Sequence, residues 1–153
     1  MKLTILPEDP CSKDSLMLMD ELSSILKSIT GDSGQKSFNI EDVKNDKSIF
    51  LIARDENNSP VGCGAIRPLN NHCAEIKRMY SKVSNIGSHI LASLEEKAVS
   101  LGYQLIRLET RKINERAVNF YLRKGYYVID NYGKYEGNEK AICFEKKLYP
   151  KQI

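Results

Sequence analysis

A strand, a loop, a helix and a second strand follow one another from Glu75 to Thr110, and this unit constrains the fold most. AEIKRMY (residues 74–80) and YQLIRLET (residues 103–110) are rich in strand formers. Between them, five apolar residues recur at helical spacing: Ile90, Leu91, Leu94, Ala98 and Leu101. Gly102 is well placed to end that helix. A helix between two strands requires a parallel pair with a right-handed crossover.

The segments before this unit predict a helix and a strand meander. KLTIL (residues 2–6) is a first strand, and a helix capped by Asp14 or Ser15 follows to about Ile29. Its predicted buried face consists of Leu18, Leu22, Ile25, Leu26 and Ile29. NIEDVK (residues 39–44) allows a short helix capped by Asn39. SIFLIAR (residues 48–54) and VGCGAIR (residues 61–67) are predicted to be strands.

The segments after the unit predict a helix and two closing strands. NERAVNFYLRKG (residues 114–125) is a helix with Asn114 as its cap and Gly125 as its end, and residues 126–132 and 141–148 are strands. The other connections are short enough for antiparallel hairpins. The sequence therefore predicts one α/β domain over residues 1–153, in which a mixed, mostly antiparallel sheet carries helices on both faces.

Charge and composition limit the partners. The net charge is +3, from 23 Lys and Arg against 20 Asp and Glu, and no basic run stands out. We therefore expect no nucleic acid partner, although an anionic ligand is mildly favoured. No apolar run approaches membrane-spanning length and the N-terminus does not resemble a secretory signal, so we expect no membrane partner and a cytoplasmic location.

The cysteines and histidines do not indicate a metal site. The four cysteines form no C-x-x-C pair, and the chain has two histidines, His72 and His89. Zinc sites need tighter clustering, so we expect no metal. We interpret all four cysteines as reduced and mostly buried.

The loop from Ser84 to His89 is the first feature that suggests chemistry. Free amides at a helix N-terminus, together with the helix dipole, attract an anion. The loop carries one glycine, Gly87, where phosphate-binding loops usually carry two or three. Taken alone, it is better explained as a plain turn in which Asn85 and Gly87 supply the bend.

Two further features lie on either side of that loop. Asn114, Ala117 and Tyr121 fall on one helix face, where a tyrosine could donate a proton to a leaving group; the alternative is a core tyrosine. Alternation in AEIKRMY places Glu75 with Lys77 and Met79 on one face, and Ile76, Arg78 and Tyr80 on the other. Glu75 is a candidate general base, or else a solvated strand charge paired with a lysine or arginine.

Together, AEIKRMY, the loop, LETRKINERAVNFYLRKGYYVI and CFEKKL resemble the GCN5-related N-acetyltransferases (GNAT) over nearly the whole chain. PVGCGAIRPL and TGDSGQKSF (residues 30–38) resemble one bacterial subgroup of small, single-domain acetyltransferases that act on small molecules. The resemblance implies that AEIKRMY splays from YQLIRLE, and that the pantetheine arm of acetyl-coenzyme A lies in the wedge. A bulge in the first strand would then aim an amide at the thioester oxygen.

The resemblance also implies individual roles. Tyr121 would act on the leaving thiolate, Glu75 would take a proton from the acceptor amine, and the acetyl group would pass directly to that amine. The cofactor-binding residues implied are Met79, Tyr80, Ser81, Ser84, Asn85, Ile86, Gly87, Ser88, His89, Asn114, Ala117 and Tyr121. The expected partner is a small-molecule amine, and a homodimer is a fair expectation.

The loop departs from the family pattern Q/R-x-x-G-x-G/A. Ser84 stands in place of the first Gln or Arg, His89 stands in place of the last small residue, and the approach to the loop is about two residues short. An Arg–phosphate contact is worth roughly 1.5–3 kcal/mol, or about one to two decades in affinity. The competing hypothesis is therefore a catalytically weakened binding or regulatory protein with an impaired pyrophosphate loop.

The acceptor side is predicted from TGDSGQKSF and from Arg67. Ser33, Ser37 and Arg67 could grip a carboxylate, which predicts an amine that also bears an acid group; Arg67 could equally end its strand in solvent. Tyr132 could close the same pocket or serve as hairpin packing. Acetylation of a protein or an aminoacyl-tRNA is a third hypothesis, and the weak net charge argues against the tRNA version.

Overall fold

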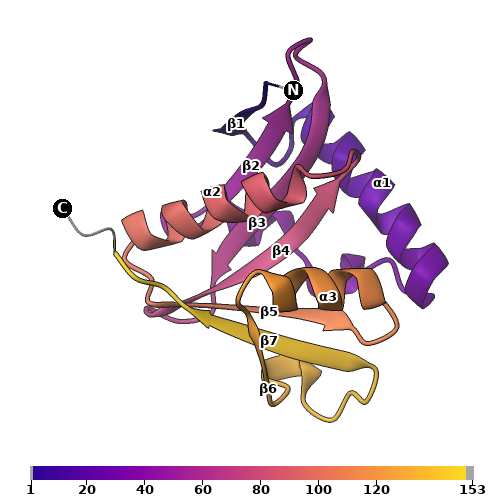
Figure 1. Cartoon of the computed structure of the whole chain (residues 1–153), viewed down its shortest axis with the longest axis vertical. Helices are drawn as coiled ribbons and strands as arrows, with labels where there is room; N and C mark the ends of the chain where they lie inside the picture. Colours follow the sequence, from indigo (N-terminus) through magenta and orange to yellow (C-terminus); the bar gives the residue numbers. More distant parts are fainter. Residues whose placement is uncertain (1, 151–153) are drawn as a thin grey trace.

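The computed structural model describes residues 2–150, apart from the side chain of Ser37. Within this range the strands form one sheet in the order β1-β2-β3-β4-β5-β7-β6 (Figure 1). The strands are β1 Thr4–Pro7, β2 Ile49–Arg54, β3 Pro60–Pro68, β4 Cys73–Ser81, β5 Leu105–Arg111, β6 Tyr127–Ile129 and β7 Ala141–Lys147. The helices are α1 Lys13–Thr30, α2 Gly87–Ser100 and α3 Glu115–Arg123, with 3₁₀ turns η1 Gln35–Ser37, η2 Ile40–Val43 and η3 Gly133–Tyr135.

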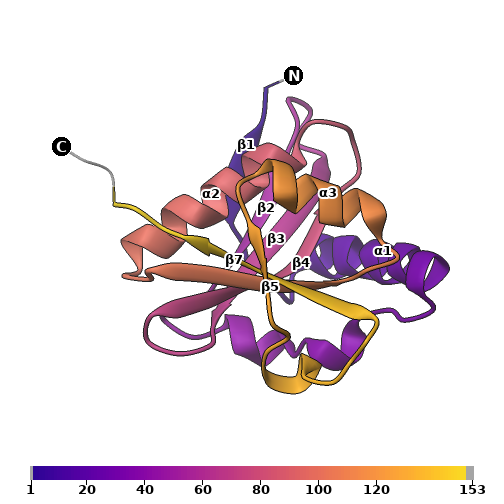
Figure 2. The ribbon, with the colours of Figure 1, turned by 60° about the horizontal axis from the view of Figure 1, so that its bottom comes forward.

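The sheet lies between two layers of helices, as the sequence predicts. Figure 2 shows α2 and α3 on one side of the sheet and α1 on the other. Alternation along the strands supplies both cores: Leu51 faces the α2 and α3 side, whereas Phe50 and Ile52 face α1 and η2. Antiparallel pairing holds throughout the sheet except between β4 and β5. The predicted mixed, mostly antiparallel α/β fold is confirmed.

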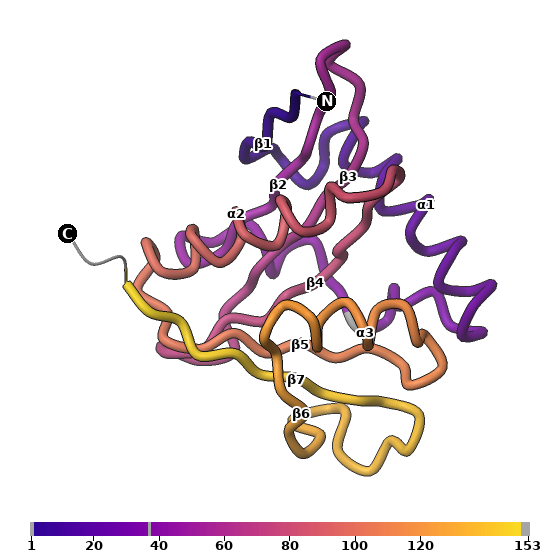
Figure 3. Tube along the Cα trace, viewed as in Figure 1, coloured from indigo at the N-terminus to yellow at the C-terminus, as the bar shows by residue number. Residues whose placement is uncertain are grey.

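The parallel pair is short, and its two strands then separate. The register joins Cys73 to Leu105 and ends with Glu75 opposite Arg107. Beyond these residues β4 continues to Ser81 and β5 to Arg111 without pairing to each other. Figure 3 traces this divergence of β4 from β5. The predicted splay of the strand pair is confirmed.

The first helix differs from its prediction at its start and on its buried face. Its cap is Ser12, whose Oγ accepts a hydrogen bond from the Ser15 amide at 3.1 Å, because the Ser15 hydroxyl is buried and donates to the Asp9 carbonyl instead. Ile25 and Ile29 are 42% and 40% exposed. The buried face instead consists of Ser15, Leu18, Met19, Leu22 and Ser23. Two serines therefore belong to the buried face of α1, and the two isoleucines do not.

The other predicted helix ends are confirmed. Asn39 caps η2 and Asn114 caps α3, each through its side-chain oxygen. Gly102 and Gly125 follow α2 and α3 with φ of +92° and +88°, a conformation that glycine adopts without strain. Local sequence signals therefore determine where these helices begin and end.

The cysteines agree with the prediction except at Cys11. All four are free; Cys63, Cys73 and Cys143 are buried and Cys11 is exposed. Burial raises the pKa of Cys63 to about 12 and that of Cys73 to about 11, so both thiols stay protonated and unreactive near neutral pH.

Two kinds of feature are absent from the described residues. No helix in residues 2–150 combines the length and hydrophobicity that a bilayer crossing requires. In the same residues, no three or more His, Cys, Asp or Glu side chains are grouped in a way that could hold a metal ion.

Candidate active site

A cavity of about 310 Å³ lies where β4 and β5 separate. Its walls come from α1, the segment around the start of η1, the diverging ends of β4 and β5, the start of α3 and the η3 region. Asn114, Ala117 and Tyr121 all line it, as expected for residues on one face of α3. The diverging strands and the predicted face of α3 therefore line the same cavity.

Tyr121 presents a free hydroxyl to this cavity. Its ring is buried among Phe120, Tyr126 and Phe144, with centroid distances of 5.1, 5.5 and 6.1 Å. Among the described residues, its hydroxyl makes no hydrogen bond, although the side chain lines the cavity. Burial raises the pKa of Tyr121 far above its usual range, so the group remains a hydrogen-bond donor at any physiological pH. Tyr121 is therefore a core residue that also lines the cavity, and its role on the leaving thiolate stays a prediction.

A β-bulge lies at the point where β4 bends away. Ala65 pairs with Lys77 and Cys63 pairs with Tyr80, so Gly64 alone faces both Arg78 and Met79. Arg78 has φ of +55°, an uncommon conformation for a residue with a side chain. The structure therefore contains the bulge that the family resemblance implies.

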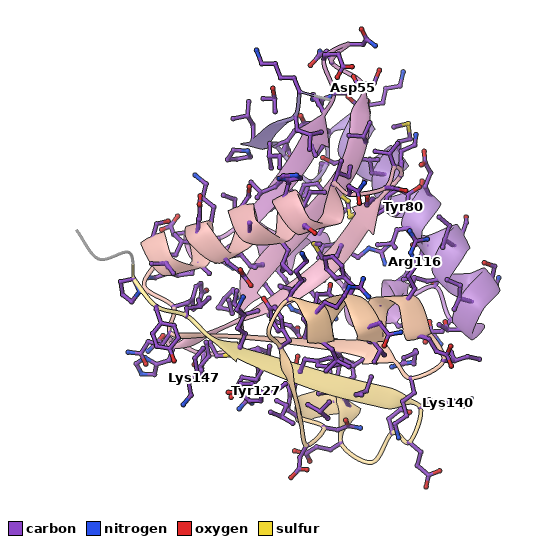
Figure 4. All side chains as sticks on the ribbon, viewed as in Figure 1. Asp55, Tyr80, Arg116, Tyr127, Lys140 and Lys147 are labelled. Atoms are coloured by element: carbon purple, nitrogen blue, oxygen red, sulfur yellow. The ribbon has the colours of Figure 1, made fainter. Side chains whose placement is uncertain are left out.

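The bulge also corrects the predicted faces of β4. Met79 packs with Ile76 on the α2 side, not with Glu75 and Lys77. Tyr80 lies on the α1 side, where its hydroxyl donates to Glu21 at 2.9 Å (Figure 4). The extra residue in the strand reverses the alternation after Lys77, so the prediction was wrong from that point onward.

Glu75 lies in a buried ion-pair network rather than on the cavity wall. It is 1% exposed, and Arg67 contacts its Oε1 through Nε at 2.9 Å and Nη2 at 2.8 Å. The Tyr132 hydroxyl donates to Oε2 at 2.5 Å, and Arg67 also pairs with Asp42 at 2.5 Å. Arg67 therefore does not end its strand in solvent, and its guanidinium already pairs with two carboxylates. Glu75 is paired, but it is not solvated, and its role as base stays a prediction.

Several ionisable residues that were not predicted as site residues line the cavity, and Lys77 and Glu109 are two of them. Burial raises the pKa of Glu109, against the opposing effect of its hydrogen-bonded neighbour Arg111. Burial lowers the pKa of Lys77 to about 8, and its Nζ lies 2.7 Å from the Tyr135 hydroxyl. The alternation of Leu108 and Glu109 in LIRLETR placed a carboxylate on the polar face of β5, and this signal could have identified Glu109.

The predicted phosphate loop leads into the N-terminus of α2. Asn85 bends the chain with φ of +72°, and α2 begins at Gly87. Ser84, Asn85 and His89 are exposed, whereas the Ile86 side chain is 2% exposed and belongs to the core. A Cβ on Gly87 would lie 3.6 Å from the Phe120 ring, so α3 passes close to this end of α2.

Not every amide at the start of α2 is available to an anion. The His89 amide donates to the Ile86 carbonyl at 3.0 Å, as part of the first helical turn. The amides of Gly87 and Ser88 donate to no group within the described residues. Two amides at the N-terminus of α2 can therefore meet an anion together with the exposed loop.

The predicted acceptor loop contributes to the cavity, but mostly through other residues. Asp32, Gly34 and Lys36 line it, whereas Ser33 accepts a hydrogen bond from Arg78 through its carbonyl at 3.3 Å and one from the Gln35 amide through its Oγ at 3.3 Å. The side chain of Ser37 lies outside the described part of the structure. The Tyr132 hydroxyl donates a hydrogen bond to Glu75. The acceptor roles of these residues stay predictions.

Sequence comparison decides the family. The model of the acetyltransferase (GNAT) family matches residues 17–126, which is more than half of the chain and includes β4, the loop and α3. The chain belongs to the GNAT family. The chemistry of this family is acetyl-coenzyme A-dependent acyl transfer.

Individual relatives agree with this assignment. The IAA acetyltransferase of Azospirillum brasilense is 25% identical over 95% of this chain and 98% of its own length. A structure from Klebsiella pneumoniae, described as a suggested acyl-CoA N-acyltransferase, has a TM-score of 0.83 and 26% identity, covering 96% of this chain and 98% of its own. An Elizabethkingia anophelis GNAT acetyltransferase, solved with acetyl-CoA bound, shares the fold at a TM-score of 0.70 and 18% identity, covering 95% and 98%.

Proposed function

We propose that this GNAT protein transfers an acetyl group directly from acetyl-coenzyme A to the primary amine of a small molecule. The observation that carries the proposal is the Tyr121 hydroxyl, which lacks a partner in the described residues and faces the cavity between β4 and β5. A donor at that position would stabilise or protonate the departing thiolate. Asn114 lines the same wall and would contact the cofactor arm.

In this proposal the cofactor lies along β4 and ends at α2. Backbone groups of Met79, Tyr80 and Ser81, on the part of β4 that no longer pairs with β5, would hold the pantetheine arm, and Ala117 would border it. The diphosphate would meet the free amides of Gly87 and Ser88, with the exposed Ser84, Asn85 and His89 beside it. An amide at the bulge would bind the thioester oxygen as its negative charge develops.

Two carboxylates are candidates for the base that takes the amine proton. Glu75 has hydrogen bonds to both of its oxygens from Arg67 and Tyr132 and lies off the cavity wall. Glu109 lines the cavity, and only its Oε2 receives a hydrogen bond within the described residues, from Arg111. The geometry favours Glu109, while Glu75 would act through the network or through water.

Calorimetry with acetyl-coenzyme A, followed by a thiol-release assay with a panel of primary amines, tests the proposal. We expect binding and amine-dependent release of free coenzyme A. Absence of binding at millimolar acetyl-coenzyme A would refute the assignment of the cavity and the loop.

A second candidate is a GNAT protein that binds coenzyme A without turnover. The observation in its favour is the loop, where Ser84 supplies no charge and the His89 amide is already bonded. Binding without thiol release across the amine panel would support this alternative, and sustained release would exclude it. We also propose that the chain works as a single domain in the cytoplasm. We further propose that it forms a homodimer, and light scattering can test this oligomeric state.

A further inference from the structure

Arg78 is a buried cation without a carboxylate partner. It is 9% exposed, and its Nη1 and Nη2 donate to the carbonyls of Ser33 and Met19 at 3.3 and 2.8 Å. Nη2 also donates to the Ser23 hydroxyl. Its buried Nε has no hydrogen-bond partner in residues 2–150, and within that range no carboxylate forms an ion pair with it.

This arrangement is energetically unusual for a guanidinium. Removing a charge from water costs several kcal/mol unless an opposite charge compensates it, and burial accordingly lowers the pKa of Arg78. The other largely buried arginine of β3 and β4, Arg67, is compensated by both Glu75 and Asp42. The hydrogen bonds of Arg78 go only to neutral oxygens, and the Phe38 ring lies 5.9 Å from its Cζ, so no carboxylate contact neutralises the guanidinium.

The cavity that Arg78 lines is positively charged overall. Its cationic residues are Lys36, Lys77, Arg78, Arg111 and Lys134. Its two carboxylates are Asp32 and Glu109. Five cations minus two anions leave a formal charge of +3, which is favourable for an anionic ligand.

Both carboxylates of the cavity are held by the same arginine. Arg111 pairs with Glu109 and lies 3.5 Å from Asp32. Neither acid therefore compensates Arg78.

Arg78 also lies on the side of the cavity that α1 and the segment before η1 close. A Cβ on Gly34 would lie 3.4 Å from Arg78 Nη1 and 3.4 Å from Leu26, so the loop backbone covers the guanidinium closely. Tyr121 lines the same cavity from α3. An acceptor that reaches from Tyr121 toward α1 would bring its second functional group to Arg78.

We propose that the acceptor carries a carboxylate beside its amine, and that Arg78 binds this carboxylate. The inference rests on the proposed acetyl transfer and extends it to a substrate class, the amino acids and related amino carboxylates. It places the anion at Arg78 rather than at Arg67, whose guanidinium already holds two carboxylates.

The test compares each of several α-amino acids with its α-carboxamide, which has nearly the same size but no negative charge. The amine of a carboxamide loses its proton more readily, so more of it is in the neutral, nucleophilic form. A faster reaction of the acid would therefore come from binding of its carboxylate and not from a more reactive amine. We expect kcat/KM to be roughly tenfold or more higher for the acid, as for one charge-assisted hydrogen bond. Arg78→Gln should bring this ratio close to one, because it removes the positive charge.

Arg123→Gln is the matched control, because Arg123 is exposed on α3 and does not line the cavity. It should retain the acid preference. A wild-type protein that acetylates carboxamides as well as acids would overturn the inference and leave the proposed acetyl transfer intact.

Wild-type protein supplies a second readout if Arg78→Gln does not fold or no amine is acetylated. Calorimetric titration with an amino acid and its carboxamide should show binding of the acid alone. Equal binding of the two, or no binding of the acid at millimolar concentration, would overturn the inference. Separate titration with acetyl-coenzyme A reports independently on the proposed function.

Discussion

Replacing Tyr121 with phenylalanine removes one oxygen atom from the cavity wall and leaves the ring in place. The ring contacts with Phe120, Tyr126 and Phe144 do not depend on the hydroxyl. Because the hydroxyl has no hydrogen-bond partner within the described residues, the free energy of unfolding should change by no more than about 0.5 kcal/mol. Any effect of Tyr121→Phe should therefore appear in catalysis and not in stability.

The expected loss of activity follows from the role of the hydroxyl. A general acid typically contributes about 10²–10⁴-fold to a rate. The strongly raised pKa of Tyr121 makes it a weak acid that acts mainly through a hydrogen bond, so we expect the lower end of that range. A fall of about 10² in kcat corresponds to about 2.7 kcal/mol of transition-state stabilisation.

Tyr126→Phe provides a control of matched chemistry. Tyr126 is also buried beside the Tyr121 ring, but its hydroxyl donates to Glu95 at 2.7 Å and does not line the cavity. Losing a hydrogen bond to a charged group costs about 1.5–3 kcal/mol, so this variant should lower Tm by several degrees and keep kcat.

Steady-state thiol release and thermal unfolding of both variants distinguish the two roles. Because Tyr121 stays protonated, the fall in kcat for Tyr121→Phe should be the same across neutral pH. An unchanged kcat in Tyr121→Phe would show that the tyrosine is only a core residue, and the reasoning about the leaving group would be wrong.

Three further tests address the loop, the base and the buried lysine. Ser84→Arg should lower the Kd of acetyl-coenzyme A by about one to two decades in calorimetry, and an unchanged Kd would mean that this position does not reach the diphosphate. Because burial raises the pKa of Glu109, Glu109→Gln should flatten the alkaline rise of kcat/KM; flattening by Glu75→Gln alone would identify Glu75 as the base instead. The pKa of Lys77 falls from 10.5 to about 8 on burial, so between these values the native protein binds fewer protons than the unfolded chain. The Lys77 contribution to stability should accordingly rise with pH in that window and be lost as pH falls through about 8. Lys77→Met should remove this rise in Tm, and an identical rise in the variant would exclude Lys77 as its source.

Much of the fold could be predicted because its signals are local. Strand alternation, helical spacing and cap residues such as Asn39 and Asn114 depend on neighbours a few residues apart. The same local spacing placed Asn114 and Tyr121 on one face of α3, where the structure finds them. The error at Ile25 and Ile29 arose because apolar spacing does not reveal how closely a helix approaches the sheet.

The contacts that could not be predicted join segments far apart in the chain. Arg67 reaches Asp42 as well as Glu75, and Tyr132 completes that network from beyond α3. Arg78 likewise meets Met19, which is 59 residues away. No short-range pattern encodes such pairs, because they depend on how β3, β4 and α1 are placed against one another.

The sequence by itself determined the order of the elements, the parallel crossover and the helix face that carries Tyr121. Only the tertiary structure decided which charged residues reach the cavity. Glu75 and Arg107 form the last pair that joins β4 to β5. Glu109 lies two residues beyond Arg107 on β5, where the two strands have separated. The bulge at Arg78 then reverses the faces of β4. Strand separation and the bulge arise from packing between distant segments. Local periodicity therefore could not show which residues line the cavity.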